Sequence, residues 1–396
     1  MQRMRNPVRR YDWGSRTAIP KLLGMDPDGE PQAELWIGAH EAAPSSLASG
    51  QRLDEAIAGD PESLVGGDVR DRFGDRLPYL TKILAADAPL SLQVHPNAQQ
   101  ARAGFAAEED AGVPRDARDR RYRDPYHKPE MIIALTRLDA LCGLRPIAET
   151  REVVRSFEVD DSAWHRLCAA LDHDDESAAL SDVVGWLLGD DPRIPDLVEL
   201  VGAQAHARRG DDAVTATIAQ LAEAYPRDPG VLVALLLHRV TLQPREALYL
   251  PAGNIHAYLR GTGLEVMASS DNVLRAGLTS KHVDRDELLR IADWTPKSVP
   301  RVSPRPVRGG VGFAYRPGFD DFEVVLADLD GDMEWQPLPL QGPRIALALS
   351  GTIELRTCAE PQDLEQGGSA FVPADEGQLT ARGAGTLVAV GVPAGT

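Results

Sequence analysis

Short apolar stretches separated by glycine and proline fill roughly the first 145 residues and return from Thr241 to the end of the chain. Apolar stretches separated in this way are typical of short β-strands joined by turns. Between residues 148 and 238 the pattern changes, because apolar residues recur at helical spacing, as they do in the stretch 183–188. The chain is therefore predicted to be mainly β with an α-helical insertion.

Two β-rich runs between Leu77 and Pro96 predict two strands joined by the turn signal at 86–89. Residues 98–109 have the spacing of a helix. The charge-dense stretch 116–123 is expected to be a solvated loop. Residues 296–306 are rich in proline and poor in apolar side chains, which predicts a linker.

The last third of the chain repeats an earlier segment. Residues 248–266 align without gaps on residues 370–388, at an offset of 122. Self-similarity of this kind predicts two copies of one β unit. In this alignment Gln378 of the second copy stands where the first copy has His256. The chemistry is therefore expected in the first copy, and a structural or oligomer-forming role in the second.

These patterns predict two cupin-type jelly-roll β-barrels plus a helical domain. The expected division has three parts. They are a catalytic cupin domain of residues 1–147 together with 240–298, a helical insertion of residues 148–239, and a C-terminal cupin-like β domain of residues 299–396.

Length and charge narrow the functional classes. A chain of 396 residues is too long for one typical core, so two or three domains are expected. No apolar run approaches the roughly 20 residues of a membrane span, and the basic start lacks the apolar region of a signal peptide. The three cysteines are too scattered for a disulfide scaffold. The expected location is therefore the cytoplasm. A net charge of −18 argues against nucleic acid or an anionic membrane as partner.

Candidate metal ligands come from three separate segments. Gln93 and His95 lie two residues apart in LSLQVHP, so on a strand both point to one face. Unpaired buried polar groups cost roughly 2–7 kcal/mol, and a metal ion is one partner that removes this cost. Glu130 in HKPE and His256 in LYLPAGNIHAY complete a possible set. Two imidazoles, a carboxylate and an amide suit a divalent transition metal, with zinc as the first choice and Fe(II) left open.

Longer segments resemble the type I mannose-6-phosphate isomerases, which are zinc enzymes of the cupin class with a helical insertion. The matching segments are LPYLTKILAADAPLSLQVHP (77–96), HKPE (127–130) and ALYLPAGNIHAYLRGTGLEVMASSDNVLRAGLT (247–279). The likeness includes YDWG at 11–14 and AELWIGAH at 33–40, and it is weak in the helical region and in the last hundred residues. Tyr126 and Glu41 depart from the family pattern, and we expect altered packing there without loss of activity.

The resemblance implies one Zn²⁺ per chain, with the ligands Gln93, His95, Glu130 and His256. It implies a catalytic role for Arg275, and the chemistry of the reaction adds Lys128, Glu265 and His127 as catalytic candidates. It also implies a substrate cleft lined by Lys82, Ser91, Tyr258 and Asp271.

The implied reaction interconverts mannose 6-phosphate and fructose 6-phosphate through a cis-enediol, with zinc stabilising the developing negative charge. Glu265 and Lys128 are candidates for the proton transfer between C2 and C1, and His127 for ring opening. Lys82 and Arg275 compete as the phosphate ligand. The resemblance further implies a place in carbohydrate metabolism such as GDP-mannose biosynthesis.

Two other functions stay open. A cupin Fe(II) dioxygenase can use the same histidines and carboxylate, but it gives no reason for the cations Lys82, Lys128 and Arg275. A non-catalytic sugar-phosphate-binding cupin predicts losses at Arg275, Glu265 or Lys128, and all three are present. A small sugar phosphate is the expected partner, and the chain is expected to be a monomer or homodimer.

Overall fold

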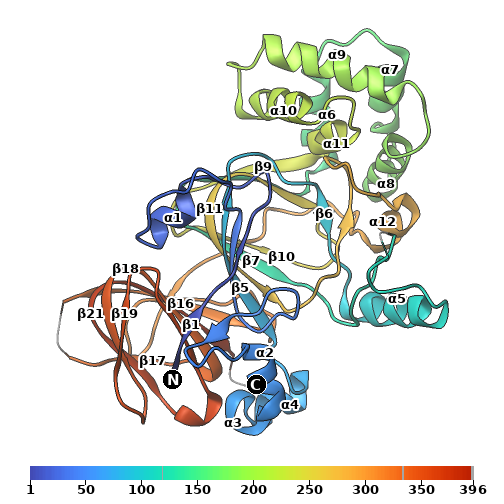
Figure 1. Ribbon diagram of the computed structural model, residues 1–396. Coiled ribbons are helices and arrows are strands. Elements are labelled where there is room, and N and C mark those ends of the chain that lie inside the picture. Colours follow the sequence, from blue (N-terminus) through green and yellow to red (C-terminus); the bar gives the residue numbers. More distant parts are fainter. Residues whose placement is uncertain (118, 332–333, 394–396) are drawn as a thin grey trace.

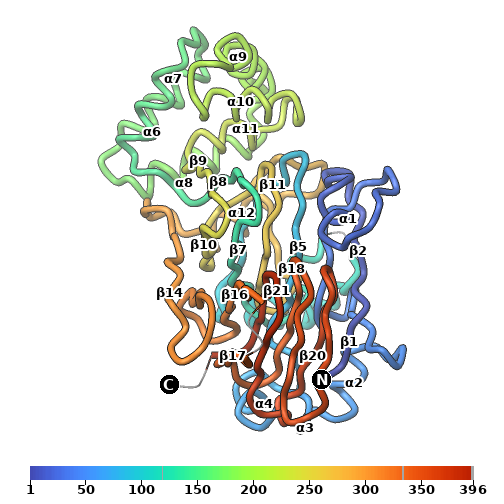
Figure 2. Tube along the Cα trace, turned by 90° about the vertical axis from the view of Figure 1, so that its left-hand side faces the viewer, coloured from blue at the N-terminus to red at the C-terminus, as the bar shows by residue number. Residues whose placement is uncertain are grey.

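The computed structural model describes residues 1–117, 119–331 and 334–393. Figure 1 shows a central β region, a second group of strands formed by the C-terminal part of the chain, and a cluster of helices at the opposite end. Figure 2 shows the same three regions after a quarter turn. The prediction of a mainly β chain with a helical insertion is confirmed, while the assignment to the cupin type stays a prediction.

The central region is an antiparallel sheet of eleven strands among the described residues. Its strands are β2 (Val8–Arg9), β3 (Glu34–Ile37), β5 (Tyr79–Ala86), β6 (Gln93–Val94), β7 (Glu130–Ala134), β8 (Leu138–Leu144), β9 (Leu237–Leu242), β10 (Ala247–Leu250), β11 (His256–Ala268), β12 (Leu274–Arg275) and β13 (Arg301–Val302). The main path runs β13-β10-β7-β11-β5-β3-β2, and β11 also pairs with β6 and β8. The long strand β11 therefore lies at the centre of this sheet.

The second sheet has ten strands in the described part of the chain. They are β1 (Gln2–Arg5), β4 (Ser46–Leu47), β14 (Arg305–Pro306), β15 (Phe313–Tyr315), β16 (Glu323–Asp330), β17 (Gln336–Leu338), β18 (Gln341–Arg356), β19 (Gln362–Glu365), β20 (Ser369–Val372) and β21 (Leu379–Val392). The N-terminal strand β1 pairs with β20, so the start of the chain joins the sheet of its end. The three-part division given above stays a proposal.

Half of the helices in the described ranges form the insertion, whose apolar faces share one core with residues of β6, β8, β11 and β12. These helices are α6 (Ile147–Arg155), α7 (Ser162–Ala170), α8 (Glu176–Leu187), α9 (Ile194–Ala207), α10 (Ala213–Ala224), α11 (Gly230–Val233) and the 3₁₀ turn η1 (Ala234–Leu236). Aspartates cap three of them, because a side-chain oxygen accepts from backbone N–H groups of the first turn. None of the helices in the described ranges is both long and apolar enough to cross a membrane.

The remaining helices lie outside the insertion. They are α1 (Ala18–Leu22), α2 (Leu53–Gly59), α3 (Pro61–Val65), α4 (Gly67–Phe73), α5 (Ala98–Asp110), α12 (Arg285–Ile291) and the 3₁₀ turn η2 (Ala374–Glu376). The helix at 98–109 is confirmed, but the expectation of only strands and loops around residues 53–73 is wrong. Asp60 caps α3 and Pro61 begins it, a pattern that favours a helix start.

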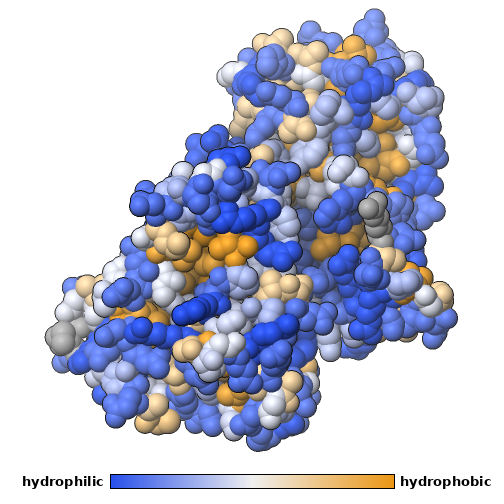
Figure 3. All heavy atoms as spheres, in the orientation of Figure 1, coloured by the Kyte–Doolittle hydropathy of each residue, from blue (hydrophilic) through white to orange (hydrophobic). Residues whose placement is uncertain are grey.

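Alternation along the strands separates an apolar face from a functional face. Leu35, Ile83 and Val266 point to the core between the two sheets, where they share a cluster with Phe371 and Val388. Their strand neighbours point to the other face. That second face carries the charged residues described below. On the outside, Figure 3 shows a mainly hydrophilic surface with separate hydrophobic patches.

The internal repeat corresponds to matching strands, since β10 and β20 start at an offset of 122. The match of His256 with Gln378 is wrong in the structure. A bulge in β11 between Tyr258 and Arg260 adds one residue that β21 lacks. His256 pairs with Gln93, whereas Leu379 pairs with Leu338, so Leu379 occupies the position of the histidine.

Candidate active site

Three predicted metal ligands lie together on the functional face of the first sheet. His95, Glu130 and His256 place their potential ligand atoms within 4.8 Å of one another, and all three side chains are buried. His95 Nε2 lies 3.3 Å from Glu130 Oε1, and His256 Nε2 lies 3.4 Å from Glu130 Oε2. This arrangement could hold a metal ion.

Backbone carbonyls orient both imidazoles toward the carboxylate. His95 Nδ1 lies 2.8 Å from the carbonyl oxygen of Asn272, and His256 Nδ1 lies 2.9 Å from that of Asn254. With Nδ1 donating to a carbonyl, the lone pair of each ring is on Nε2. His95 Nε2 has no hydrogen-bond partner in the described ranges, and burial lowers the pKa of His95 to about 4. A neutral histidine with an unsatisfied ring nitrogen fits a metal ligand.

Gln93 stands directly opposite His256 across the pairing of β6 with β11, and Arg275 of β12 pairs with its other side. Residues opposite one another on antiparallel strands direct their side chains to the same face. The position of Gln93 is therefore compatible with a fourth ligand.

A buried ion pair lies on the same face. Lys82 of β5 pairs in register with Glu265 of β11, and Lys82 Nζ lies 3.1 Å from Glu265 Oε2. Glu34 Oε1 is 3.9 Å from the same ammonium, and Trp36 Nε1 donates to Glu34 Oε2 at 2.7 Å. The Lys82 ammonium also lies 4.9 Å from the centre of the Trp36 ring. Lys82, predicted to bind substrate, is thus held by protein carboxylates.

The electrostatics set the charge states of these groups in opposite directions. Burial raises the pKa of Glu265 above its ordinary value, and Lys82 only partly offsets this effect. Burial alone would lower the pKa of Lys82, but Glu34, Glu265 and Glu130 raise it, so the ammonium stays charged. Burial would raise the pKa of Glu130, yet Lys128 and His95 hold it well below the ordinary range. Glu130 is therefore ionised and able to bind a cation.

The other predicted residues surround this centre at different depths. Lys128 Nζ contacts Glu130 Oε1 at 3.0 Å. The buried Tyr258 hydroxyl has no hydrogen-bond partner within the described ranges, and burial raises the pKa of Tyr258 well above its ordinary value. His127 Nε2 lies 2.9 Å from Asp321 Oδ1, so this histidine contacts the C-terminal part of the chain. Ser91, two residues before Gln93, is half-buried.

Asp271 takes part in a contact that links two segments. Its Oδ1 lies 3.4 Å from His40 Nε2, and the His40 ring packs edge-on against Trp36 with ring centres 5.0 Å apart. Burial lowers the pKa of His40, although Asp271 opposes the shift. Asp271 thus connects the segment after β11 to the segment after β3.

Arg275 differs from Lys82 because no carboxylate lies within 4 Å of its guanidinium in the described part of the chain. Burial and the nearby Arg123 lower the pKa of Arg275. Arg275 and Arg123 in turn contribute to lowering the pKa of Lys281. The positive charges of these three residues repel one another, and a bound anion offsets that repulsion. This group therefore favours an anion even within an acidic chain.

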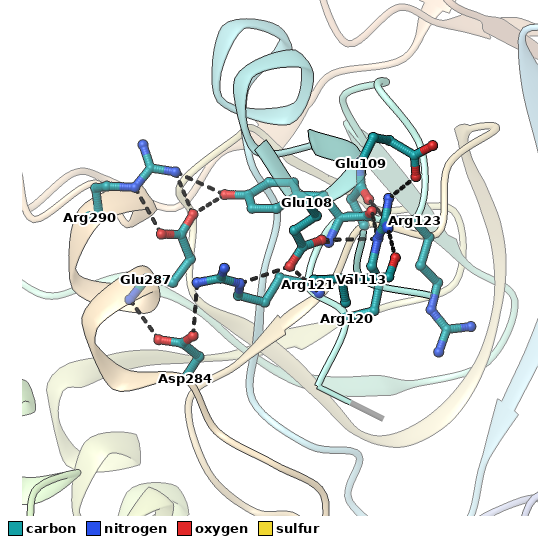
Figure 4. A network of polar contacts seen from close by, with 11 residues as sticks. Glu108, Glu109, Val113, Arg120, Arg121, Arg123, Asp284, Glu287 and Arg290 are labelled. Atoms are coloured by element: carbon teal, nitrogen blue, oxygen red, sulfur yellow. Dashed lines mark hydrogen bonds and ion pairs between the residues drawn. The ribbon is translucent and has the colours of Figure 1, made fainter. Parts of the chain in front are cut away.

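A network of ion pairs fixes the loop that carries Arg123, as Figure 4 shows. Buried Glu108 contacts Arg120 and Arg121 at 3.0 Å each, and Arg121 reaches Asp284 at 3.2 Å. Arg123 itself points away from this network. The expectation of a solvated loop at 116–123 is therefore wrong for Arg120 and Tyr122, because Glu108 on the preceding helix draws them into a buried cluster.

Several contributors were not predicted as site residues. They are Glu34 and Trp36 beside Lys82, His40 beside Asp271, Asn272 behind His95, and the cations Arg123 and Lys281. Glu34 and Trp36 carried a usable signal, since an alternating strand places a carboxylate and an indole on the face opposite Leu35 and Ile37. The electrostatic effect of Arg123 on Arg275 had no such signal, because it depends on how two distant loops meet.

Comparisons with known proteins agree with this geometry. The family described as "Phosphomannose isomerase type I, catalytic domain" matches residues 1–147. The mannose-6-phosphate isomerase of Escherichia coli K12 is 37% identical, over 98% of this chain and 99% of that protein. The human mannose-6-phosphate isomerase is 32% identical, over 93% of this chain and 92% of that protein.

A crystal structure of mannose 6-phosphate isomerase bound with zinc and yttrium has a TM-score of 0.90 and 35% identity, and the match covers all of both chains. Similarity at this level spans both sheets and the insertion, so it includes the regions where the sequence motifs are weakest. The chain belongs to the type I phosphomannose isomerases.

Proposed function

We propose that the chain interconverts mannose 6-phosphate and fructose 6-phosphate as an aldose–ketose isomerase. One observation supports this proposal most directly. A group able to hold a metal ion, His95, Glu130 and His256, shares a buried sheet face with the Lys82–Glu265 pair. Similarity to named mannose-6-phosphate isomerases supplies the substrate.

We propose Zn²⁺ as the cofactor, held by His95, Glu130 and His256, with Gln93 as a fourth ligand. When bound, the ion supplies a positive charge that polarises sugar oxygens and stabilises negative charge on them. The neutral state of His95 and the ionised state of Glu130 suit this role, because a metal binds the deprotonated form of each ligand.

Glu265 is our candidate for moving the proton between C2 and C1 of the open-chain sugar. A general base works best when its pKa is near the operating pH, and burial moves the pKa of Glu265 upward in that direction. Lys82 keeps its proton and holds the Glu265 carboxylate in place at 3.1 Å. Lys128, beside Glu130, is the alternative candidate or a ligand for an anionic sugar oxygen.

His127 is our candidate for ring opening. Its Nε2 contacts Asp321, so its other ring nitrogen is available to exchange a proton with a sugar oxygen. Tyr258 offers a buried hydroxyl without a protein partner in the described ranges, and this group could bind a sugar hydroxyl. Ser91 and Asp271 complete the proposed cleft.

We propose that the substrate phosphate binds Arg275 together with Lys281 and Arg123. Lys82 is less suited, because Glu265 and Glu34 already neutralise it. Arg275 has no such partner within the described ranges, and a guanidinium can bind two phosphate oxygens at once. A local group of cations also overcomes the repulsion between a phosphate and a chain of net charge −18.

The metal and cation sites favour an isomerase over the iron dioxygenase and over a binding protein without turnover. The remaining expectations are proposals of the same kind. They are a cytoplasmic location, a monomeric or homodimeric state, and no nucleic-acid or membrane partner.

The decisive experiment is turnover of mannose 6-phosphate to fructose 6-phosphate by the purified protein. The assay is run before chelation, after chelation and after Zn²⁺ is restored. We expect activity that chelation removes and zinc returns. Tight zinc binding without isomerisation would refute the proposed function.

A further inference from the structure

The second sheet borders a cavity of about 680 Å³ that the proposed reaction does not use. It lies between the helices α3 and α4 and the strands β17 and β18, at the end of the molecule away from the insertion (Figure 2). Its walls include Val65, Val69, Leu338, Leu340, Arg72 and Arg344. The cavity therefore combines apolar walls with two arginines.

This cavity is located where the second sheet repeats the metal site of the first. Leu338 and Leu379 pair as Gln93 and His256 do, so apolar residues replace two proposed ligands. Leu340, two residues after Leu338, corresponds in the same way to His95. A metal ion is therefore not favoured here.

One repeat equivalent of Glu130, the carboxylate of the proposed metal site, shows which charge the cavity carries. Glu130 pairs with Leu250 of β10, and Arg344 pairs with Val372 of β20, which is the repeat equivalent of Leu250. By the pairing with β20, a guanidinium stands where the first sheet has a carboxylate. By the pairing with β21, the equivalent of Glu130 is Ala346, two residues further along the same face of β18.

Arg344 is buried, with 1% of its surface exposed. One terminal nitrogen donates to the carbonyl oxygen of Pro373 at 2.7 Å and the other to that of Gly377, while Nε has no partner in the described ranges. No carboxylate of the described residues lies within 4 Å of it, and burial lowers its pKa. A buried charge without a counter-ion is costly, and a bound anion removes part of that cost.

We propose that this cavity binds a small organic anion, in which one carboxylate or phosphate group meets Arg344 and a compact apolar body contacts Leu338, Leu340 and Val69. Arg72, whose guanidinium also lies 3.7 Å from Asp320, adds a second positive charge at the exposed rim, and Asp68 adds a negative one. The bound anion lies at the part of the second sheet that corresponds to the proposed metal site of the first.

The test is calorimetric titration of the zinc-loaded protein with two probes, inorganic phosphate and benzoate. The two probes separate a phosphate ligand from a carboxylate ligand with an apolar body. Arg72→Gln and Asp68→Asn change exposed rim residues without entering the core, and neither residue takes part in the proposed reaction. Binding at the Arg275 cluster is expected to be equal in all variants and serves as the internal reference.

We expect binding of at least one probe to weaken about tenfold in Arg344→Gln, because a charge-assisted hydrogen bond is lost. Binding of the same probe should weaken severalfold in Arg72→Gln and strengthen severalfold in Asp68→Asn. Turnover of mannose 6-phosphate should be unchanged in these two variants. The rim variants decide the matter even if Arg344→Gln fails to fold. If neither probe shows a binding event that weakens in Arg72→Gln and strengthens in Asp68→Asn, the proposal is overturned.

Discussion

Lys82 and Glu265 face each other across the pairing of β5 with β11, with 3.1 Å between Nζ and Oε2. The pair holds a carboxylate of raised pKa beside an ammonium that stays charged. A base of this kind needs a fixed position and a usable pKa, and the same strand register supplies both. The contact therefore links the sheet directly to the proposed chemistry.

Replacing Glu265 with Gln should lower kcat about 10²- to 10⁴-fold, which is the usual contribution of a general base. The side chain keeps its shape, so the zinc content should stay at one per chain. Steady-state kinetics and metal analysis of the same preparation test this prediction. A kcat within threefold of the unmodified protein would transfer the proton-transfer role to Lys128.

The pH profile of kcat/KM should show an acid limb above the ordinary glutamate pKa of 4.5, because burial raises the pKa of Glu265. The base acts when deprotonated, so activity is present above the raised pKa and lost as the pH falls through it. Lys82 lowers the pKa of Glu265, so Lys82→Met should move the limb to higher pH. A limb that stays in place in this variant would assign it to another group.

Replacing Arg275 or Lys281 with Gln should raise the KM for mannose 6-phosphate about tenfold or more, since a hydrogen bond to a charged group contributes about 1.5–3 kcal/mol. Turnover of unphosphorylated mannose, if it is measurable, should change much less, because that substrate lacks the phosphate. Lys297→Gln, which breaks an exposed contact with Asp293, is the matched control. Equal losses for both substrates would argue against a phosphate site.

The metal should contribute to stability as well as to catalysis. A ligand that binds only the folded state stabilises it by about 2.7 kcal/mol at 100 times its dissociation constant, so chelation should lower the Tm. His256→Ala should abolish the zinc-dependent part of the Tm. His165→Ala, which alters an exposed histidine of the insertion, should retain it. Zinc-dependent stabilisation that survives in His256→Ala would place the metal elsewhere.

Local patterns predicted the parts of the fold that depend on neighbouring residues. The two strands flanking the turn at 86–89 and the helix at 98–109 were correct, because alternation and helical spacing act over a few residues. The convergence of His95, Glu130 and His256 was also predicted, although there the family resemblance contributed more than spacing did. Three distant segments cannot be placed together by periodicity alone.

The missed features depend on tertiary contacts. The pairing of Gln2–Arg5 with the last third of the chain has no local signal. The bulge in β11 shifts the repeat by one residue, so a gapless alignment could not match His256 with Leu379. The charged stretch 116–123 appeared solvated because each residue was considered alone, whereas Glu108 compensates the buried charge of Arg120.

The contact of Glu108 with Arg120 should be worth far more than a surface ion pair. Both side chains are almost fully buried, and Glu108 Oε2 lies 3.0 Å from Arg120 Nε. Removing one partner of a buried pair costs about 3–5 kcal/mol, because the other charge is left without compensation. Arg120 keeps its contact with the half-exposed Glu109 at 2.7 Å, so Glu108→Gln should lower the free energy of unfolding by at most about that amount.

The control is Glu223→Gln, which breaks an exposed contact of Glu223 with Arg209 and should cost no more than about 1 kcal/mol. Denaturant unfolding of the two variants gives the comparison, and Glu108→Gln combined with Arg120→Met tests the cause. If uncompensated charge on Arg120 causes most of the loss, the double variant should regain part of the stability. A double variant as unstable as the sum of its single changes would show that packing, and not charge, makes this loop depend on Glu108.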